Sequence, residues 1–74
     1  MIHPLRLQRL QKGISQYHLA WELGIPQVRI SYAERGYPSL TDRQKDRLAE
    51  YFSTSVDDLF PATVRTESDE KGGE

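Results

Sequence analysis

The sequence predicts a small all-α domain, a compact bundle of five short helices over residues 1–60, with an acidic tail over residues 61–74. Three observations predict this fold. A chain of 74 residues has room for one modest hydrophobic core. Its apolar residues recur at helical spacing in short segments, which glycine or proline residues separate. The tail carries four acidic and two basic side chains and little apolar surface, so we expect it to be disordered.

The first helix is expected from Pro4 to about residue 12, because proline suits the first turn of a helix and the glycine that follows residue 12 can end one. Leu5, Leu7 and Leu10 are its apolar positions. They do not form one clean helical stripe, so the sequence leaves the register of this helix against the core open.

The second helix begins after Ser15, whose hydroxyl is placed to accept a backbone N–H that has no partner within the helix. Leu19, Ala20 and Leu23 then share one face, which is the pattern of a buried helical stripe. Gly24 follows directly, and a glycine in the left-handed conformation can end a helix without a Cβ clash.

The third helix is predicted over residues 26–35. Pro26 lies in its first turn, Ile30 and Ala33 mark its inner face, and Gly36 ends it. Two short helices joined by a tight turn form the arrangement that lays the second helix into the major groove of DNA. The sequence therefore predicts a helix-turn-helix, with residues 26–35 as its recognition helix.

Two capping-box spacings predict the last two helices. Thr41 followed by Gln44 opens the fourth helix, and Ser55 followed by Asp58 opens a short fifth helix that Pro61 ends. The apolar residues expected to face the core from these helices are Leu48, Ala49, Phe52, Val56, Leu59 and Phe60.

The charge distribution permits DNA binding without favouring it. The formal net charge of the chain is −1. Residues 1–35, however, hold five basic side chains against two acidic ones, whereas residues 61–74 hold two basic against four acidic. The charge on a binding face matters more than the total, so a basic face on the helix-turn-helix remains compatible with this composition.

Several classes of function are not expected. The chain has no cysteine, so it offers no disulfide and no thiolate metal ligand, which fits a reducing cytoplasm. Its apolar runs are too short for a membrane span or a signal-peptide core. With two histidines, no cysteine and no glycine-rich phosphate loop next to a strand, no catalytic constellation is visible. We therefore expect a cytoplasmic protein that is not an enzyme, with no cofactor, no metal and no membrane partner.

The stretch from about Leu5 to Phe60 resembles the Cro/phage-repressor type of helix-turn-helix domain, the XRE family. The matching pieces are Arg9, Lys12-Gly13-Ile14-Ser15-Gln16, Leu19-Ala20, Leu23-Gly24-Ile25, Ile30-Ser31, Glu34-Arg35-Gly36, Pro38-Ser39, Leu48-Ala49 and Val56-Asp57-Asp58-Leu59-Phe60. The resemblance implies a lambda repressor-like fold of five short helices and sequence-specific binding to operator DNA as a dimer.

The resemblance also bears on single positions. An acid at the far end of a recognition helix repels phosphate if it points outward, so Glu34 is expected to pair with Arg9, and both residues stand at the family's usual positions for that pair. The chain departs from the family at two places. Gln8 stands where an apolar residue is usual, and Ser53 stands where glycine is usual. The end of the fourth helix must therefore be built differently, or with strain.

The outer face of the predicted recognition helix carries side chains suited to reading base edges. Gln27 can pair with adenine through N6 and N7, although it can equally bind a phosphate or cap the helix. Val28 suits a thymine methyl group, or else packs on the stem of Gln27. Arg29 matches guanine O6 and N7; its alternatives are a phosphate or an ion pair with Glu22. Tyr32 can bind phosphate, stack on sugar and base edges, or fold back onto the domain.

Contacts to the DNA backbone are expected from a second group of residues. Gln16 lies in the first turn of the second helix, where backbone N–H groups and the helix dipole favour an anion, so it is predicted to bind a phosphate. The further backbone contacts predicted from the recognition helix and the loop after it are Ser31, Arg35, Tyr37 and Ser39.

Four residues are candidates for a protein interface. Tyr17 and Trp21 lie one turn apart, off the buried face of the second helix, and exposed aromatic residues can anchor a partner. They can equally cover the first helix or pack with Tyr51. Leu59 and Phe60 in the fifth helix are the candidate dimer surface.

These predictions describe a small DNA-binding transcriptional regulator, a repressor that binds a two-fold symmetric operator as a homodimer. The rival is an interaction module that uses the same fold to bind protein through Tyr17 and Trp21. A variant of the first hypothesis is an antitoxin that binds both its toxin and its own operator.

Overall fold

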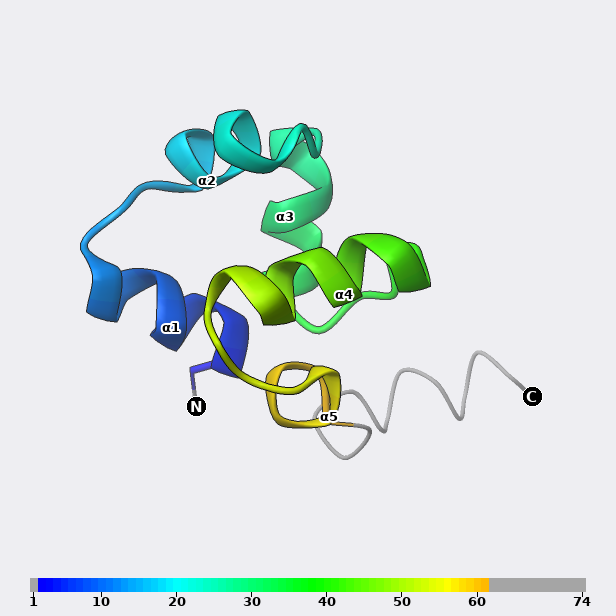
Figure 1. Ribbon diagram of the computed structural model, residues 1–74. Coiled ribbons are helices and arrows are strands. Elements are labelled where there is room, and N and C mark those ends of the chain that lie inside the picture. The colour runs from blue at the N-terminus through cyan, green and yellow to red at the C-terminus, as the bar shows by residue number, and fades with distance from the viewer. Residues whose placement is uncertain (1, 62–74) are drawn as a thin grey trace.

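The computed structural model describes residues 2–61, and within this range it contains five α-helices and no strand (Figure 1). The helices are α1 (Pro4–Lys12), α2 (Gln16–Leu23), α3 (Gln27–Glu34), α4 (Asp42–Tyr51) and α5 (Val56–Leu59). The prediction of an all-α bundle with a helix-turn-helix is confirmed. The tail predicted over residues 61–74 lies, apart from Pro61, outside the described residues.

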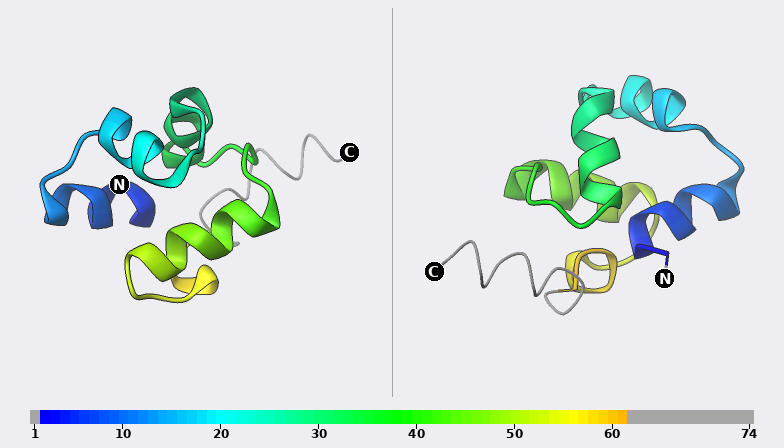
Figure 2. Two further views of the ribbon diagram at one scale, coloured as in Figure 1. Left: turned by 45° about the horizontal axis from the view of Figure 1, so that its top comes forward. Right: turned by 180° about the vertical axis from the view of Figure 1, so that it is seen from behind.

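The helices surround one core. In Figures 1 and 2, α3 runs away from the end of α2 at a steep angle, α1 lies on one side of it and α4 on the other, and α5 lies under α4. The buried apolar residues of this core are Leu5, Leu19, Ala20, Leu23, Ile25, Ile30, Ala33, Leu48, Ala49, Phe52 and Leu59. All five helices and the turn between α2 and α3 contribute to this set, which holds α3 with its inner face buried and its outer face free.

Local chemistry explains where the helices begin. The hydroxyl of Ser15 accepts a hydrogen bond from the backbone N–H of His18 at 3.0 Å. Thr41 and Gln44 exchange both bonds of a capping box, at 3.1 and 3.0 Å. The hydroxyl of Ser55 accepts from the N–H of Asp58 at 3.0 Å. Each of these bonds satisfies an amide at a helix start that has no partner within the helix, as the sequence predicted.

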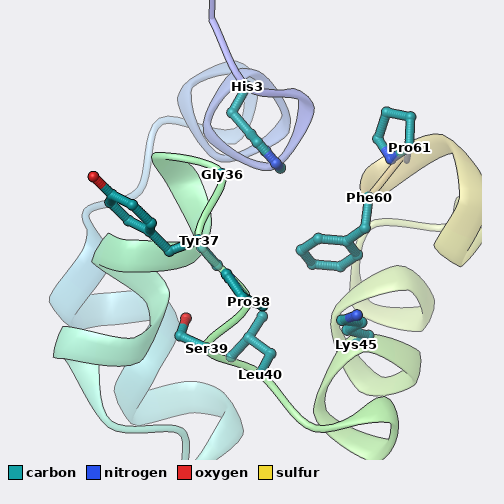
Figure 3. Close-up of a pocket in the computed structure, with 10 residues that line it drawn as sticks. His3, Gly36, Tyr37, Pro38, Ser39, Leu40, Lys45, Phe60 and Pro61 are labelled. Atoms are coloured by element: carbon teal, nitrogen blue, oxygen red, sulfur yellow. The ribbon is translucent and has the colours of Figure 1, made fainter. Parts of the chain in front are cut away.

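The start of α1 depends on a cap that the sequence did not predict. His3 is buried, and its Nδ1 accepts a hydrogen bond from the N–H of Leu5 at 3.0 Å. Its ring points toward Phe60, with 6.0 Å between the ring centroids (Figure 3). Burial lowers the pKa of His3 below its usual 6.5, and the negative charge of Glu34 opposes this shift. The neutral imidazole is therefore the form that caps α1.

The structure decides the register of α1. Leu5 is fully buried and Arg9 is buried one turn later, whereas Leu7 and Leu10 are 44% and 46% exposed. At the start of α3 the difference from the prediction is one residue. Pro26 is the residue that caps this helix, in an extended conformation, and the helical residues begin at Gln27.

Leu59 requires a correction. It was predicted both to face the core and to contribute to a dimer surface, and the structure agrees only with the first prediction, because Leu59 is 1% exposed and belongs to the core. Phe60 is partly buried against the same core. The reason is that α5 packs against α1 and α4, and Leu59 is the residue of α5 that this packing buries.

The end of α4 is strained. Ser53 has φ 55°, and it is the one non-glycine residue with a positive φ among the described residues. This left-handed conformation costs a residue with a Cβ about 1–2 kcal/mol relative to glycine. Of the two possibilities that the sequence left open for this helix end, strain is therefore the one that the structure shows.

None of the helices formed by residues 2–61 combines the length and the apolar character that crossing a membrane requires.

Candidate nucleic-acid interface

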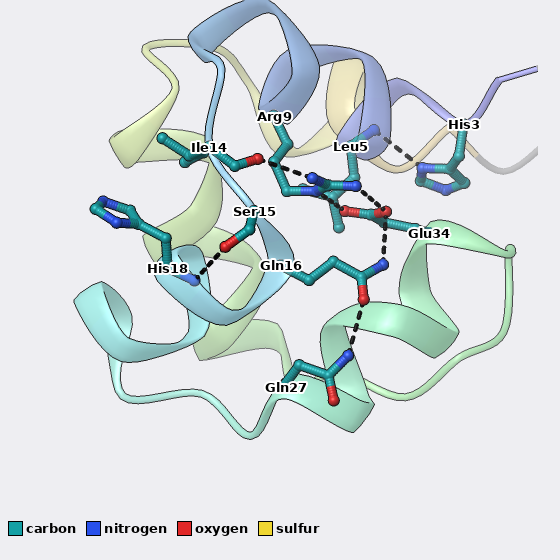
Figure 4. Close-up of polar contacts among 9 residues, drawn as sticks. All are labelled: His3, Leu5, Arg9, Ile14, Ser15, Gln16, His18, Gln27 and Glu34. Atoms are coloured by element: carbon teal, nitrogen blue, oxygen red, sulfur yellow. Dashed lines mark hydrogen bonds and ion pairs between the residues drawn. The ribbon is translucent and has the colours of Figure 1, made fainter.

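An ion pair joins α1 to α3. Arg9 Nε lies 2.6 Å from Glu34 Oε2, and Arg9 Nη2 donates to Glu34 Oε1 at 3.1 Å (Figure 4). The two side chains are 10% and 3% exposed. Arg9 also donates to the backbone oxygen of Ile14 at 2.8 Å, which ties the segment before α2 into the same contact. The structure thus brings together the two residues that were expected to form a structural pair.

A row of hydrogen bonds continues from this ion pair to the first residue of α3. Gln16 Nε2 donates to Glu34 Oε1 at 3.0 Å, and Gln27 Nε2 donates to Gln16 Oε1 at 2.8 Å. Figure 4 shows the row, with the carbonyl oxygen of Gln27 turned away from Gln16. Gln27 therefore keeps its carbonyl oxygen and its second N–H, side by side, for another partner.

Arg29 is held by the loop after α3. Its Nη1 donates to the backbone oxygen of Ser39 at 2.9 Å, and the hydroxyl of Ser39 donates to the backbone oxygen of Arg29 at 2.7 Å. Among the described residues the alternative ion pair of Arg29 with Glu22 is not found; the carboxylate of Glu22 instead lies 4.0 Å from His18 Nε2. Arg29 is exposed, so its remaining N–H groups face solvent.

Tyr32 leans toward the same loop. Its ring meets that of Tyr37 edge to face, with 5.9 Å between centroids, and the guanidinium of Arg35 lies 5.5 Å from the centre of the Tyr32 ring. All three side chains stay exposed, and Val28 is exposed in the first turn of α3. The residues of this group that were predicted to contact DNA are therefore exposed on α3 and on the loop that follows it.

A polar pocket of about 260 Å³ opens where α1, α2 and α3 meet. Its lining residues are Arg6, Arg9, Gln16, Ser31, Glu34 and Arg35. Because Glu34 is neutralised by Arg9, the described residues that line this pocket carry a net positive charge, which the guanidinium groups of Arg6 and Arg35 supply. The pocket thus gathers three of the predicted backbone contacts in a setting that attracts an anion.

Arg6 is a residue that sequence reasoning missed. It lies three residues before Arg9, and that spacing places two side chains on one face of a helix. The spacing was visible in the sequence. Its meaning was not, because the register of α1 was needed to know that this face meets α3.

The aromatic residues of α2 lie apart from these groups. Tyr17 and Trp21 are 71% and 79% exposed. Tyr51, which was a possible partner for them, packs instead against the ring of Phe52 and lies under the amino group of Lys12. Tyr17 and Trp21 are therefore exposed to solvent and do not pack with Tyr51.

Comparison with known protein families identifies the family to which this chain belongs. A family model described as helix-turn-helix, HTH_3, matches residues 5–59. The chain belongs to this XRE-type helix-turn-helix family. Membership makes it a DNA-binding domain of the transcription-regulator type, with α2 and α3 as the helix-turn-helix. No curated protein and no solved structure gave a significant match.

Proposed function

We propose that this helix-turn-helix protein is a sequence-specific transcriptional repressor that binds a two-fold symmetric operator as a homodimer. The observation that carries the proposal is the hydrogen bond from Gln27 to Gln16. It holds the first residue of α3 with one donor and one acceptor facing solvent, and the start of a recognition helix is where side chains meet base edges.

Gln27 is assigned to adenine. The carbonyl oxygen of an amide accepts from adenine N6, and its N–H donates to N7, so the free edge of Gln27 has the matching pattern. Gln16 restricts the rotation of this amide before DNA arrives, which lowers the entropic cost of the contact. A good bidentate pair of this kind discriminates against a wrong base by about 1–3 kcal/mol.

Arg29, Val28 and Tyr32 are assigned to the neighbouring positions. Arg29 uses one N–H on Ser39, so the guanidinium keeps a fork that fits guanine O6 and N7. Val28 projects from the first turn of α3, where a thymine methyl group would bury it. Tyr32 presents its hydroxyl and ring edge further along the same face.

The polar pocket is assigned to a phosphate of the DNA backbone. Arg6 and Arg35 supply charge and Ser31 a hydroxyl, while Gln16 keeps one free N–H beside Glu34. Tyr37 and Ser39 extend the backbone contacts along the loop after α3. These contacts set the position of α3 in the groove and carry no base preference of their own.

Selection of bound duplexes from a random DNA pool tests the proposal. We expect the wild type to enrich a two-fold symmetric motif with half-sites about 34–36 Å apart. Gln27→Ala should lose preference at one adenine in each half-site, and Gln11→Ala, at an exposed glutamine of α1, should leave the motif unchanged. Enrichment of an asymmetric motif contradicts the homodimer, and no enrichment at low salt contradicts the repressor.

A second candidate is a protein-interaction module, including an antitoxin that binds a toxin as well as DNA. The exposure of Tyr17 and Trp21 favours it, because large exposed aromatic residues anchor protein interfaces. Salt separates the two candidates. DNA affinity should fall with a log–log slope of about −0.9 for each phosphate contact, whereas an aromatic protein contact should change little with salt.

A further inference from the structure

A second pocket lies on another side of α3 from the polar pocket. It has a volume of about 130 Å³. Figure 3 shows it between the N-terminal residues, the loop after α3, the start of α4 and the end of α5. We call it the His3 pocket, and its lining residues are His3, Ala33, Gly36, Tyr37, Pro38, Ser39, Leu40, Lys45, Phe60 and Pro61.

The walls of the His3 pocket are mostly apolar. Pro38 and Leu40 form one side, and the ring of Phe60 faces them across the opening (Figure 3). The volume is close to that of an apolar cavity of about 150 Å³ that holds a benzene molecule. A ligand with one ring, or with a short branched chain, therefore matches the space.

Two side chains of the pocket, His3 and Lys45, supply hydrogen-bond donors. His3 Nδ1 accepts from the N–H of Leu5, so the proton of the neutral ring is on Nε2. Lys45 Nζ lies 5.8 Å from the centre of the Phe60 ring, and the His3 ring centre lies 6.0 Å from the same point. None of the described residues that line the pocket carries a carboxylate. A neutral donor and one cation around an aromatic wall suit an anionic head group.

We propose that the His3 pocket binds a small carboxylate with a compact apolar body. The carboxylate pairs with Lys45, and the body lies between Phe60, Pro38 and Leu40. The carboxylate gains charge-assisted hydrogen bonds while the apolar part leaves water. With only about nine non-hydrogen atoms in such a ligand, the expected dissociation constant is about millimolar.

The pocket shares two residues with the surface assigned to DNA. Ser39 lines the pocket and holds Arg29 through two hydrogen bonds, and Tyr37 lines it and packs on Tyr32. A ligand that contacts this loop therefore affects the positions of Arg29 and Tyr32. We infer that ligand and DNA change each other's affinity, a coupling that is reciprocal by necessity. This coupling rests on the proposed function, whereas the ligand site does not.

The site is tested by titrating the full chain with sodium benzoate and following backbone amide signals by NMR at neutral pH. Benzamide, which has the same shape without the charge, is the matched ligand. Lys45→Gln is the test variant. Lys12→Gln is its control, because Lys12 also lies over an aromatic ring, 5.4 Å from the centre of Tyr51, but outside the pocket.

We expect saturable shifts at Ser39, Leu40 and Lys45, and benzamide should bind about fivefold to tenfold more weakly than benzoate. Lys45→Gln should lower the affinity for benzoate by about the same factor, and Lys12→Gln should leave this affinity unchanged. Absence of saturable shifts overturns the site. Equal binding of benzamide, unchanged binding in Lys45→Gln, or shifts confined to Arg6 and Arg35 of the polar pocket also overturn it.

The coupling is tested on the duplex that the selection enriches. Saturating benzoate should change the affinity of the wild type for this duplex by about threefold or more, and should do so much less in Lys45→Gln. Benzoate binding without any change in DNA affinity keeps the site and overturns the coupling. Failure of the protein to bind any duplex contradicts the proposed function and leaves the NMR result on the ligand site intact.

Discussion

Gln27, the first residue of α3, donates a 2.8 Å hydrogen bond to the side-chain oxygen of Gln16, the first residue of α2. The starts of the two helices are thereby joined through side chains as well as through the turn. Because Gln16 also donates to Glu34, the bond connects the surface assigned to bases with the buried Arg9–Glu34 pair. The residue assigned to base contact and the buried ion pair therefore belong to one network.

The first prediction is that Gln16 and Gln27 act on DNA as a unit. Gln16→Ala and Gln27→Ala should each weaken binding to the selected duplex by about 1–3 kcal/mol. The double variant should lose less than the sum, by about 1 kcal/mol, because either single change already releases the Gln27 amide. Binding of the two single variants and the double variant to the selected duplex and to a scrambled one measures this. Additive losses contradict the orienting role of Gln16.

Arg29 should carry guanine preference. Arg29→Ala is expected to cost about 1–3 kcal/mol on the selected duplex and to relax preference at one guanine in each half-site. Arg43→Ala removes an exposed arginine of α4 and is the control for charge alone. Equal losses on all duplexes in Arg29→Ala would assign Arg29 to phosphate instead of a base.

The buried ion pair should be costly to break and cheap to replace. Glu34→Ala leaves the guanidinium of Arg9 buried without its charge partner, which is expected to cost about 3–5 kcal/mol of unfolding free energy. Arg9→Met combined with Glu34→Leu should recover much of this loss. Urea denaturation measures both variants. Glu22→Ala, at a half-exposed acid of α2, should change stability by less than about 0.5 kcal/mol.

Ser53→Gly should stabilise the domain. The substitution relieves the left-handed backbone of Ser53, which is expected to add about 1 kcal/mol. Ser55→Gly is the matched change two residues later, at a cap with an extended backbone, and it should lower stability by a few tenths of a kcal/mol. Thermal unfolding of the two variants should therefore shift in opposite directions.

The free energy of unfolding should decrease as the pH is lowered below about 6.5, because of His3. Burial lowers its pKa in the folded state, so the unfolded chain binds the proton more readily than the folded one. The contribution is complete above the unfolded value of 6.5 and is lost as the pH falls through the lower folded value. His3→Asn keeps a capping side chain without a titrating group, and should flatten the dependence of the urea midpoint on pH. His18→Asn, at an exposed histidine of α2, should retain it.

Much of the fold was predictable because its signals are local. Ser15, Thr41 and Ser55 satisfy amides only three residues away, and Gly24 ends α2 through its own backbone conformation. The cap at His3 was missed, because histidine is not among the residues that commonly cap helices. The start of α3 was predicted one residue early, at Pro26.

Less of the site was predictable. The outer face of α3 follows from helical periodicity, so the sequence predicted which of its side chains face solvent. The polar contacts that hold these side chains join residues far apart in sequence: Gln27 to Gln16, Arg29 to Ser39 and Arg9 to Glu34. The family resemblance suggested the last pair, and nothing in the sequence suggested the first two.

The sequence by itself determined the helices, the turn between α2 and α3 and the outer face of α3, because each depends on neighbours within about one helical turn. Only the tertiary structure decided which face α1 buries, that Leu59 is too deeply buried to form a dimer surface, and that Arg6 joins the polar pocket. The physical reason is that burial and long-range hydrogen bonds depend on how helices pack. Leu5, Leu7 and Leu10 lie on different faces of α1, so the sequence allowed more than one packing of this helix. In the structure, α1 buries the face that carries Leu5 and Arg9, and Arg9 pairs there with Glu34.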